Sequence, residues 1–305
     1  MAESLRAGVI GAGVFGGYHA AKYAKLNDVR LAAVMDPHPD RARAIAEPHG
    51  AAAFSELPAF LTAVDIVSIA SPASAHSAQA LAVLGAGKHV YIEKPIATSL
   101  DDADLIVATA RERGLVAACG FLERAAFRVI GLFDIPRSPL RLEASRLGRP
   151  AKRNLDVSVV LDLMIHDLDL ALGLTRAEPL TVEATGACVN NDLLDEAEAV
   201  IDFDDGFAAR LTASRVAEGS RRLMKLVYPC GHIVIDFLAH TFENTTSYVL
   251  DPAYEATPAG HDRLGASLAA FIAAVRGEAP RPLADALDGA RALDLALAVE
   301  QAVGR

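Results

Sequence analysis

The chain has 305 residues, of which 52% are hydrophobic and 22% are charged, and its formal net charge is −10. This length exceeds the usual size of one domain, and the composition is that of a globular protein, so we expect two folded domains. The acidic balance argues against nucleic acid as the main partner, because phosphate binding needs a basic face.

Targeting signals and metal-ligand patterns are absent from the sequence. No basic region followed by an apolar stretch opens the chain, and no window approaches ~18 uninterrupted apolar residues, so we expect a cytoplasmic protein with no membrane partner. Cys119, Cys188 and Cys230 are far apart, which favours reduced thiols in the core over disulfides. They offer no metal-ligand spacing, even with His232 near Cys230.

Residues 1–120 alternate between apolar runs and helical patterns. The expected strands cover residues 5–10, 29–35, 64–70, 89–92 and 116–119. The expected helices cover about 17–26, 37–46, 75–85 and 99–113. Ser99 has the character of an N-cap, and Gly114 ends that last helix. This alternation predicts an α/β domain with a parallel, doubly wound Rossmann sheet over residues 1–120.

Beyond residue 120 the pattern changes to alternating apolar and polar positions separated by turn signals. The expected strands cover residues 140–147, 181–190, 197–203, 208–214, 222–228, 232–237 and 245–250. Helices are expected at about 156–173, 263–275 and 284–303. We therefore expect an α+β domain over residues 121–305 with a largely antiparallel, open-faced sheet.

The segment Gly11-Ala12-Gly13-Val14-Phe15-Gly16 follows the first expected strand and opens the first helix. In this spacing the first glycine permits a tight turn, the second lets the backbone approach a pyrophosphate, and the third lets the helix pack on the strand. The helix N-terminus then faces the anion. The motif predicts a dinucleotide site, and the context on both sides argues against a coincidental turn.

Asp36 ends the second expected strand, 25 residues after Gly11. Its carboxylate suits the two hydroxyls of an adenosine ribose and repels a 2′-phosphate, which favours NAD over NADP. Arg41 and Arg43 lie just beyond and oppose that preference, so NADP is not excluded. Ser71-Pro72, after the next strand, and His76 are expected on the nicotinamide side, although a capped helix start explains them equally well.

The tripeptide Glu93-Lys94-Pro95 directly follows the strand 89–92. The chain has six lysines, so 23 of its 29 basic residues are arginine. Unlike arginine, a partly desolvated lysine can release a proton near neutral pH, which makes Lys94 a candidate for proton transfer. The alternative is a surface lysine before a turn-forming proline.

A second candidate segment is the helix around Asp162-Leu163-Met164-Ile165-His166. At 100° per residue, Asp162, His166 and Asp169 share one face, while Asp167 points about 100° away from His166 and is given a separate role. The other faces are apolar, so the helix is expected to be buried and its polar stripe to meet partners or line a cavity. The alternative is that these side chains satisfy one another in the core.

Four basic residues, Arg146, Arg149, Lys152 and Arg153, precede this helix on an expected loop. Two interpretations are equally weighted. The residues contact a diphosphate, as in a nucleotide sugar, or they form a solvated basic loop.

The glycine turn, Glu93-Lys94-Pro95 and the Asp162-x-x-x-His166 helix, in this order, resemble the glucose-fructose oxidoreductase, inositol dehydrogenase and rhizopine catabolism (Gfo/Idh/MocA) family. The resemblance spans nearly the whole chain. It implies an NAD(P)-dependent oxidoreductase with an N-terminal Rossmann domain and a C-terminal open-faced sheet. That sheet is often used for assembly, so we expect a homodimer or homotetramer.

In the family pattern Lys94 contacts the reacting hydroxyl, His166 is the acid/base, and Asp162 orients or polarises His166. Which of Lys94 and His166 takes the proton is left open. The expected cofactor contacts are Gly11, Gly13, Val14, Phe15, Gly16, Asp36, Arg41, Ser71, Pro72, His76, Glu93 and Lys94. The expected substrate contacts are Lys94, Glu123, Arg124, Asp162 and His166. No metal is expected.

The segment Gly120-Phe121-Leu122-Glu123-Arg124 and residues 159–162 resemble the branch of the family that acts on UDP-N-acetylglucosamine at C3. The chain departs from that branch at Ala125-Ala126-Phe127, where Phe-Asn-Pro is common. The expected activity is oxidation of a secondary hydroxyl of a sugar or nucleotide sugar to a ketone. The alternatives are an inositol or free-sugar dehydrogenase and, from another class, a non-catalytic NAD-sensing binding protein.

Overall fold

The computed structural model describes residues 4–150, 156–190 and 192–304. The chain forms two compact units, which are treated separately below. The first comprises Met1–Phe121 and Leu264–Ala290, and the second comprises Leu122–Arg263 and Arg291–Arg305. The segment 264–290 thus joins the first unit, whereas a single division at residue 120 leaves it in the second.

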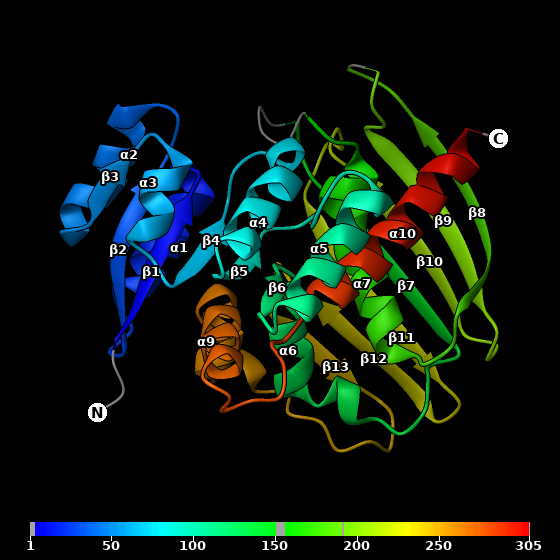
Figure 1. Cartoon of the computed structure of the whole chain (residues 1–305). Helices are drawn as coiled ribbons and strands as arrows, with labels where there is room; N and C mark the ends of the chain where they lie inside the picture. The colour runs from blue at the N-terminus through cyan, green and yellow to red at the C-terminus, as the bar shows by residue number, and fades with distance from the viewer. Residues whose placement is uncertain (1–3, 151–155, 191, 305) are drawn as a thin grey trace. The chain divides into compact units, whose positions relative to one another are not determined.

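The first unit is built on a six-stranded parallel sheet in the order β3-β2-β1-β4-β5-β6 (Figure 1). Its strands are β1 (Leu5–Ile10), β2 (Val29–Met35), β3 (Ala52–Phe54), β4 (Ile66–Ile69), β5 (His89–Ile92) and β6 (Ala117–Cys119). This strand order reverses direction between β1 and β4, and ligands of open α/β sheets bind at such a switch point. The expected doubly wound sheet is confirmed.

The helices of the first unit include five that follow strands of this sheet in sequence and one, α9, that comes after the second unit's strands. They are α1 (Val14–Tyr23), α2 (Pro39–Ala46), α3 (Leu57–Thr62), α4 (His76–Gly85), α5 (Leu100–Glu112) and α9 (Arg263–Val275). Ser99 is confirmed as the N-cap of α5, since its hydroxyl accepts the Asp102 N–H at 3.3 Å. The short elements β3 and α3 were not expected from the sequence, because their apolar runs are too brief to show a period.

Helix α9 packs into the first unit although more than 140 residues separate it from Phe121, where the N-terminal segment of that unit ends. The Tyr91 hydroxyl lies 2.9 Å from the Ser267 hydroxyl, and the Tyr91 and Phe271 rings meet edge to face. Further on, Cys119 N–H donates to the Ala284 carbonyl at 3.0 Å. Through these contacts the segment 264–290 packs against β5 and β6.

The second unit is built on a seven-stranded sheet in the order β13-β12-β11-β7-β10-β9-β8. Its strands are β7 (Arg141–Leu147), β8 (Pro179–Ala187), β9 (Glu196–Phe203), β10 (Ala208–Ser214), β11 (Arg221–Tyr228), β12 (Gly231–Asp236) and β13 (Thr241–Asn244). All pairs are antiparallel except β7 with β10. The expected largely antiparallel sheet is therefore confirmed.

One face of this sheet carries helices α7 (Ile165–Leu174) and α10 (Ala286–Val303) (Figure 1). Burial alternates along the strands: on β7, Leu142, Ala144 and Arg146 are buried, while their neighbours are more exposed. The alternation follows from the two-residue period of a strand, which sends successive side chains to opposite faces. Two short helices complete the unit, α6 (Glu123–Ile130) and α8 (Pro258–His261).

Two expected elements of the second unit are wrong in detail. The helix expected at 156–173 begins with a π-helical turn, Val160–Met164, and continues as α7. It starts late because the Ser158 hydroxyl accepts the N–H groups of Val160 and Leu161, at 3.1 and 3.2 Å, and so caps it.

The strand expected at 245–250 is instead β13, at Thr241–Asn244. The Asn244 side-chain oxygen accepts the Thr246 N–H at 2.9 Å and the Thr246 hydroxyl at 2.6 Å. This side-chain turn ends the strand, because asparagine offers the backbone an alternative to the ladder.

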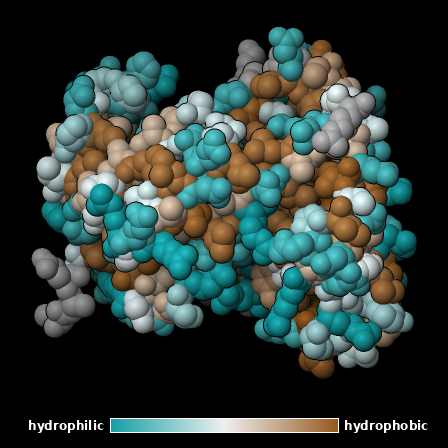
Figure 2. All heavy atoms as spheres, turned by 45° about the vertical axis from the view of Figure 1, so that its right-hand side comes forward, coloured by the Kyte–Doolittle hydropathy of each residue, from teal (hydrophilic) through white to brown (hydrophobic). Residues whose placement is uncertain are grey.

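On the face drawn in Figure 2, exposed hydrophobic residues lie in patches separated by hydrophilic ones. Within the described part of the chain, no helix combines the length and the apolar character that crossing a membrane requires. None of the three cysteines is in a disulfide, and only Cys119 is buried, so the expectation of three core thiols is wrong for Cys188 and Cys230.

Candidate active site

The glycine turn of the first unit has the geometry that a bound pyrophosphate needs. Gly11 has a φ of +94°, and a Cβ there would lie 2.7 Å from the Ser71 backbone nitrogen. A Cβ on Gly16 would lie 1.8 Å from the Gly11 carbonyl oxygen. Beside Gly13, in contrast, no atom lies within 4 Å of the Cβ position. Two glycines thus permit close packing, and the third leaves space for a ligand at the start of α1.

Asp36 ties this turn to the end of β2. Its Oδ2 accepts the Ala12 N–H and its Oδ1 accepts the His38 N–H, each at 2.9 Å. Each carboxylate oxygen keeps a second lone pair, so both can still accept from ribose hydroxyls. Val14 and Phe15 expose their side chains at the start of α1, where an aromatic or apolar part of a ligand could pack.

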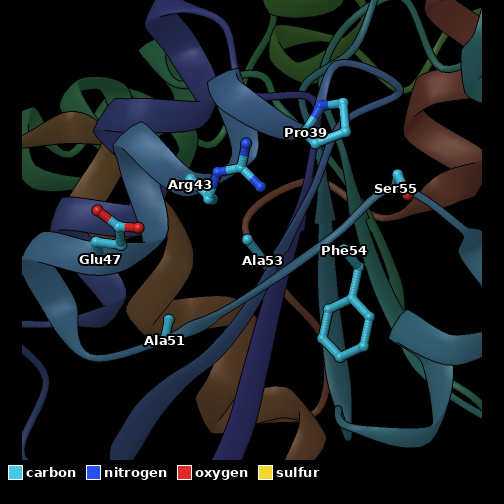
Figure 3. Close-up of a pocket in the computed structure, with 7 residues that line it drawn as sticks. All are labelled: Pro39, Arg43, Glu47, Ala51, Ala53, Phe54 and Ser55. Carbon is cyan, nitrogen blue, oxygen red and sulfur yellow. The ribbon is translucent and has the colours of Figure 1, made fainter.

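A hollow of about 430 Å³ lies next to Asp36. One of the residues that line it is Phe54, whose carbonyl oxygen accepts the Asp36 N–H at 3.1 Å. Its lining comes from α2, β3 and the residues after them: Pro39, Arg43, Glu47, Ala51, Ala53, Phe54 and Ser55 (Figure 3). Arg43 also pairs with Asp40, and Arg41 is exposed. Arg43 thus lines this hollow while its guanidinium is paired with Asp40.

His76, at the start of α4, is buried and faces two backbone carbonyls. Its Nδ1 lies 2.7 Å from Pro95 O and its Nε2 lies 3.0 Å from Ser71 O. The ring thus joins the loop after β4 to the loop after β5. Burial lowers the pKa of His76, although the carbonyls of Pro95 and Ser71 favour its protonated form. Ser71 itself donates to Gln79 at 2.6 Å, and Pro72 is exposed.

Lys94 follows β5, is partly buried, and is joined to Pro95 by a cis peptide bond. Its neighbour Glu93 turns inward and is 7% exposed. Glu93 Oε1 lies 2.9 Å from His19 Nε2, across 74 residues of sequence. Both flanks of Lys94 are thus held, Glu93 by a side chain of α1 and Pro95 by His76.

The Glu93 contact continues into a fully buried chain of hydrogen bonds. His19 Nδ1 lies 3.0 Å from the Ser68 hydroxyl, and the Tyr23 hydroxyl lies 2.7 Å from the same oxygen. An ionised Glu93 only accepts, so His19 donates to it through Nε2, Ser68 donates to His19, and Tyr23 donates to Ser68. Burial raises the pKa of Tyr23 more than the Ser68 hydrogen bond lowers it, which keeps this hydroxyl a donor.

This chain of hydrogen bonds was not expected from the sequence. The available signal was the spacing of the buried face of α1, on which Gly16, His19, Ala20 and Tyr23 recur at intervals of three and four. A polar residue at such a position needs a buried partner.

In the second unit, His166 on α7 is held against α6. Its Nδ1 lies 3.0 Å from Glu123 Oε2, at ion-pair distance, and its side chain is 13% exposed. Asp162 lies in the π-helical turn before it and is buried. The 100° wheel used for this segment is wrong there, because a π turn advances less per residue than an α turn. The structure thus places Glu123, as well as Asp162, near the expected acid/base.

Glu123 and Arg124 are engaged within the protein. Glu123 Oε1 accepts from Arg146 Nη1 at 2.9 Å. Arg124 forms a bidentate ion pair with Asp169, in which Nε and Nη2 donate to the carboxylate oxygens at 2.7 to 3.1 Å. Both expected substrate contacts therefore also hold α6 to its neighbours.

The expected basic loop is wrong for Arg146. This residue lies on β7, is 3% exposed, and binds Asp167 through Nε and Nη2 at 3.1 and 2.7 Å. A guanidinium that is buried among carboxylates is not available to a diphosphate. Arg149 is exposed and donates to the Glu218 carbonyl, whereas Lys152 and Arg153 lie outside the described residues.

Asp167 is also placed differently from the expectation. It was given a role separate from His166, but Arg146 links it to Glu123 and so to His166. In the described parts of the chain, no group of three or more His, Cys, Asp and Glu side chains is arranged to hold a metal ion.

Comparison with known proteins settles the family. Residues 5–121 match the family model for the oxidoreductase family with an NAD-binding Rossmann fold, and residues 130–234 match the model for the Gfo/Idh/MocA C-terminal domain. The chain belongs to the Gfo/Idh/MocA family. It is an oxidoreductase whose first unit is the NAD-binding Rossmann fold.

Several Gfo/Idh/MocA relatives cover most of the chain. It is 38% identical to UDP-N-acetylglucosamine 3-dehydrogenase of Acidithiobacillus ferrooxidans, over 98% of this chain and 97% of the relative. It is 28% identical to scyllo-inositol 2-dehydrogenase (NAD(+)) of Bacillus subtilis, over 79% of this chain and 76% of the relative.

The solved structures agree with this family assignment. UDP-N-acetylglucosamine 3-dehydrogenase GnnA from Acidithiobacillus ferrooxidans superposes with a TM-score of 0.91 and 37% identity, over 99% of this chain and 98% of that one. The WlbA dehydrogenase from Bordetella pertussis, in complex with NADH and UDP-GlcNAcA, has a TM-score of 0.88 at 19% identity, over 100% of this chain and 96% of that one. The second similarity concerns the fold alone.

Proposed function

We propose that this protein is an NAD-dependent dehydrogenase that oxidises a secondary hydroxyl of a nucleotide sugar, UDP-N-acetylglucosamine at C3, to a ketone. The observation that carries the proposal is the 38% identity to UDP-N-acetylglucosamine 3-dehydrogenase over 98% of this chain. The glycine turn with open space at Gly13, and the carboxylate of Asp36, support the cofactor half of the proposal.

Oxidation of an alcohol removes a hydride from carbon and a proton from oxygen. NAD, when bound, accepts the hydride. The chain itself must take the proton, and Lys94 and His166 are the two groups proposed for this task. Lys94 either removes the proton, or stays charged and stabilises the developing alkoxide while His166 accepts it.

Positions in the structure support separate duties for the remaining proposed site residues. Asp162, buried in the turn before His166, is proposed to face the substrate and orient His166. Gly11, Gly16 and Asp36 are proposed to shape the cofactor site rather than to react. Arg149 is the described basic residue of the segment before this helix that remains exposed, and it is proposed to meet the diphosphate.

An inositol or free-sugar dehydrogenase is the second candidate, since an inositol dehydrogenase matches 79% of the chain at 28% identity. A buried Arg146 removes one of the basic side chains expected for a diphosphate and so favours this candidate. A non-catalytic NAD sensor has no comparable support.

The decisive experiment measures absorbance at the reduced nicotinamide band with the purified protein. UDP-N-acetylglucosamine, N-acetylglucosamine, inositols and glucosides are each tested with NAD and with NADP. We expect the highest kcat/KM with UDP-N-acetylglucosamine and NAD, and a product that has lost two hydrogens, located at C3 by NMR. Faster turnover of an inositol would replace the proposal with the second candidate, and cofactor binding without any turnover would favour the sensor.

We also propose that the protein works as a cytoplasmic homo-oligomer that uses the face of the seven-stranded sheet opposite α7 and α10. The free cysteines support a reducing compartment. Sedimentation equilibrium tests the assembly, and a monomer at micromolar concentration would contradict it.

A further inference from the structure

A closed ring of charged side chains lies behind His166 in the second unit. Glu123 Oε2 lies 3.0 Å from His166 Nδ1, at ion-pair distance, and Glu123 Oε1 accepts from Arg146 Nη1 at 2.9 Å. Arg146 then binds Asp167 at 2.7 Å, and Asp167 is the next residue to His166 on α7. The ring therefore starts and ends on the same helix, so each member limits the movement of the next.

Every charged member of this ring is buried, which sets its electrostatics. Glu123 is 8% exposed, and Arg146 and Asp167 are each 3% exposed. Two carboxylates and one guanidinium give a formal charge of −1 while His166 is neutral, and zero once His166 is protonated. A buried unbalanced charge is costly, so the ring favours the imidazolium.

The other groups around His166 act in the same direction or are balanced. Arg124 and Asp169 form a buried pair with no net charge. Asp162, in the turn before His166, adds a carboxylate. Burial by itself would raise the pKa of Glu123, but the charges of His166 and Arg146 outweigh burial and hold that pKa well below its usual range. Glu123 is thus an acceptor throughout the working pH range.

We propose that Glu123 is a positioning residue of His166 that acts at Nδ1, in addition to Asp162. In this role its carboxylate accepts the Nδ1–H, which fixes the tautomer and makes Nε2 the nitrogen that takes the proton of the substrate hydroxyl. Arg146 and Asp167 fix Glu123 in turn. This inference rests on the proposed function, because it gives His166 the role of the base.

The hydroxyl proton passes to His166 Nε2, the carbon–hydrogen bond breaks with its electron pair leaving as hydride to NAD, and the oxygen–carbon double bond forms. The positive charge created on the imidazole lies against the Glu123 carboxylate. The same logic governs a carboxylate that orients a histidine base in hydrolases, where removing the charge costs turnover far more than substrate binding.

The first test is Glu123→Gln, which keeps the shape but removes the charge. We expect kcat to fall at least tenfold, with the substrate KM and the NAD affinity within about twofold of wild type. The pH at which kcat/KM falls on the acid side should move to lower pH, because the neutral amide no longer favours the imidazolium. Glu123→Asp, which restores a carboxylate, should return that limb toward its wild-type position.

The matched control is Glu178→Gln. Glu178 also pairs with an arginine in the second unit, Arg291 at 2.8 Å, but both side chains are exposed. This variant should leave kcat and the pH profile unchanged. A Glu123→Gln enzyme with wild-type kcat and an unshifted acid limb would overturn the proposal.

A second measurement does not depend on turnover. The ¹⁵N chemical shifts of His166, assigned by comparison with His166→Gln, report its tautomer in the full-length protein. We expect the Nδ1–H form in wild type and its loss in Glu123→Ala. An Nε2–H form in wild type would refute the positioning role even if the enzyme is active. Conversely, an Nδ1–H form without any turnover would refute only the proposed function.

Discussion

The two units bury polar side chains in different ways. In the first, one carboxylate, Glu93, ends a chain of hydrogen bonds through His19, Ser68 and Tyr23. In the second, the ring around Arg146 contains three formally charged residues before His166 is counted. The hydrogen-bonded chain holds a loop with little buried charge, whereas the ring gives a strong local field and depends on every member being present.

This difference suggests a division of labour. The first unit has to hold the backbone around Lys94 in place, for which directional hydrogen bonds suffice. In the proposed function the second unit favours a positive charge on His166, for which an excess of negative charge is needed. Variants in each unit test this contrast.

Lys94→Met should reduce turnover by about 10² to 10⁴-fold, the range for a lost acid/base group, while NAD affinity measured by fluorescence titration stays close to wild type. Lys88→Met is the control, since Lys88 lies at the other end of the same strand, directly before β5. Equal turnover in the Lys94 and Lys88 variants would remove Lys94 from the chemistry.

Arg146→Met should lower the free energy of unfolding by about 3 to 5 kcal/mol, because it leaves two carboxylates buried without their partner. Urea denaturation followed by circular dichroism measures the change. A loss below about 1 kcal/mol would mean that water or a rearrangement relieves the charges, and that the ring is not rigid.

The two units should also respond to acid at different pH values. The pKa of His76 is lowered by burial, so the unfolded state binds its proton first and this contribution to stability declines as pH falls below about 6.5. His89, whose pKa burial also lowers, acts in the same sense. The pKa of Glu123 is lowered by its partners, so its contribution persists until pH falls below about 4.3.

Hydrogen exchange at pH 7.5 and 5.5 separates these effects. Protection should decline in α4 and β5, whereas in α6 and β7 it should stay constant or rise, because the ring around Arg146 favours protonated His166. His76→Asn should flatten the response of the first unit over this range. Equal loss of protection in both units would contradict the assignment of the acid response to His76 and His89.

Ser68→Ala should lower the free energy of unfolding by about 1 to 3 kcal/mol, because His19 and Tyr23 lose the hydroxyl that lies between them. The expected loss is smaller than for Arg146→Met, since no charge is left unpaired. Thermal unfolding of both variants in one buffer makes the comparison, and a larger loss in Ser68→Ala would reverse the contrast between the units. The smallest change is expected for the exposed ion pair of Glu178 and Arg291. Glu178→Gln should change the free energy of unfolding by less than about 1 kcal/mol.

Much of the fold was accessible from the sequence. The strands at 29–35, 89–92 and 208–214 and the helix at 263–275 agree with the structure to the residue. Their apolar periods are long or their ends are marked by turn residues. Elements whose ends depend on a single side chain were misplaced, as with Ser158 and Asn244.

The candidate site divides in the same way. The glycine turn and Lys94 could be found because each motif is contiguous and follows a strand. The partners of His166 could not, because Glu123 and Arg146 lie 43 and 20 residues away in the sequence, on elements whose packing no local pattern specifies. The position of Arg146 near other basic residues even suggested an exposed loop, because such a residue is usually solvated.

The sequence by itself determined the Rossmann unit, the antiparallel sheet and the residue types available for proton transfer. It could do so because periodicity and glycine spacing are local properties of the chain. Only the tertiary structure decided that 264–290 belongs with the first unit, that His19 holds Glu93, and that Glu123 faces His166. These contacts join distant segments, and burial makes their partners obligatory without indicating in advance which residues they are.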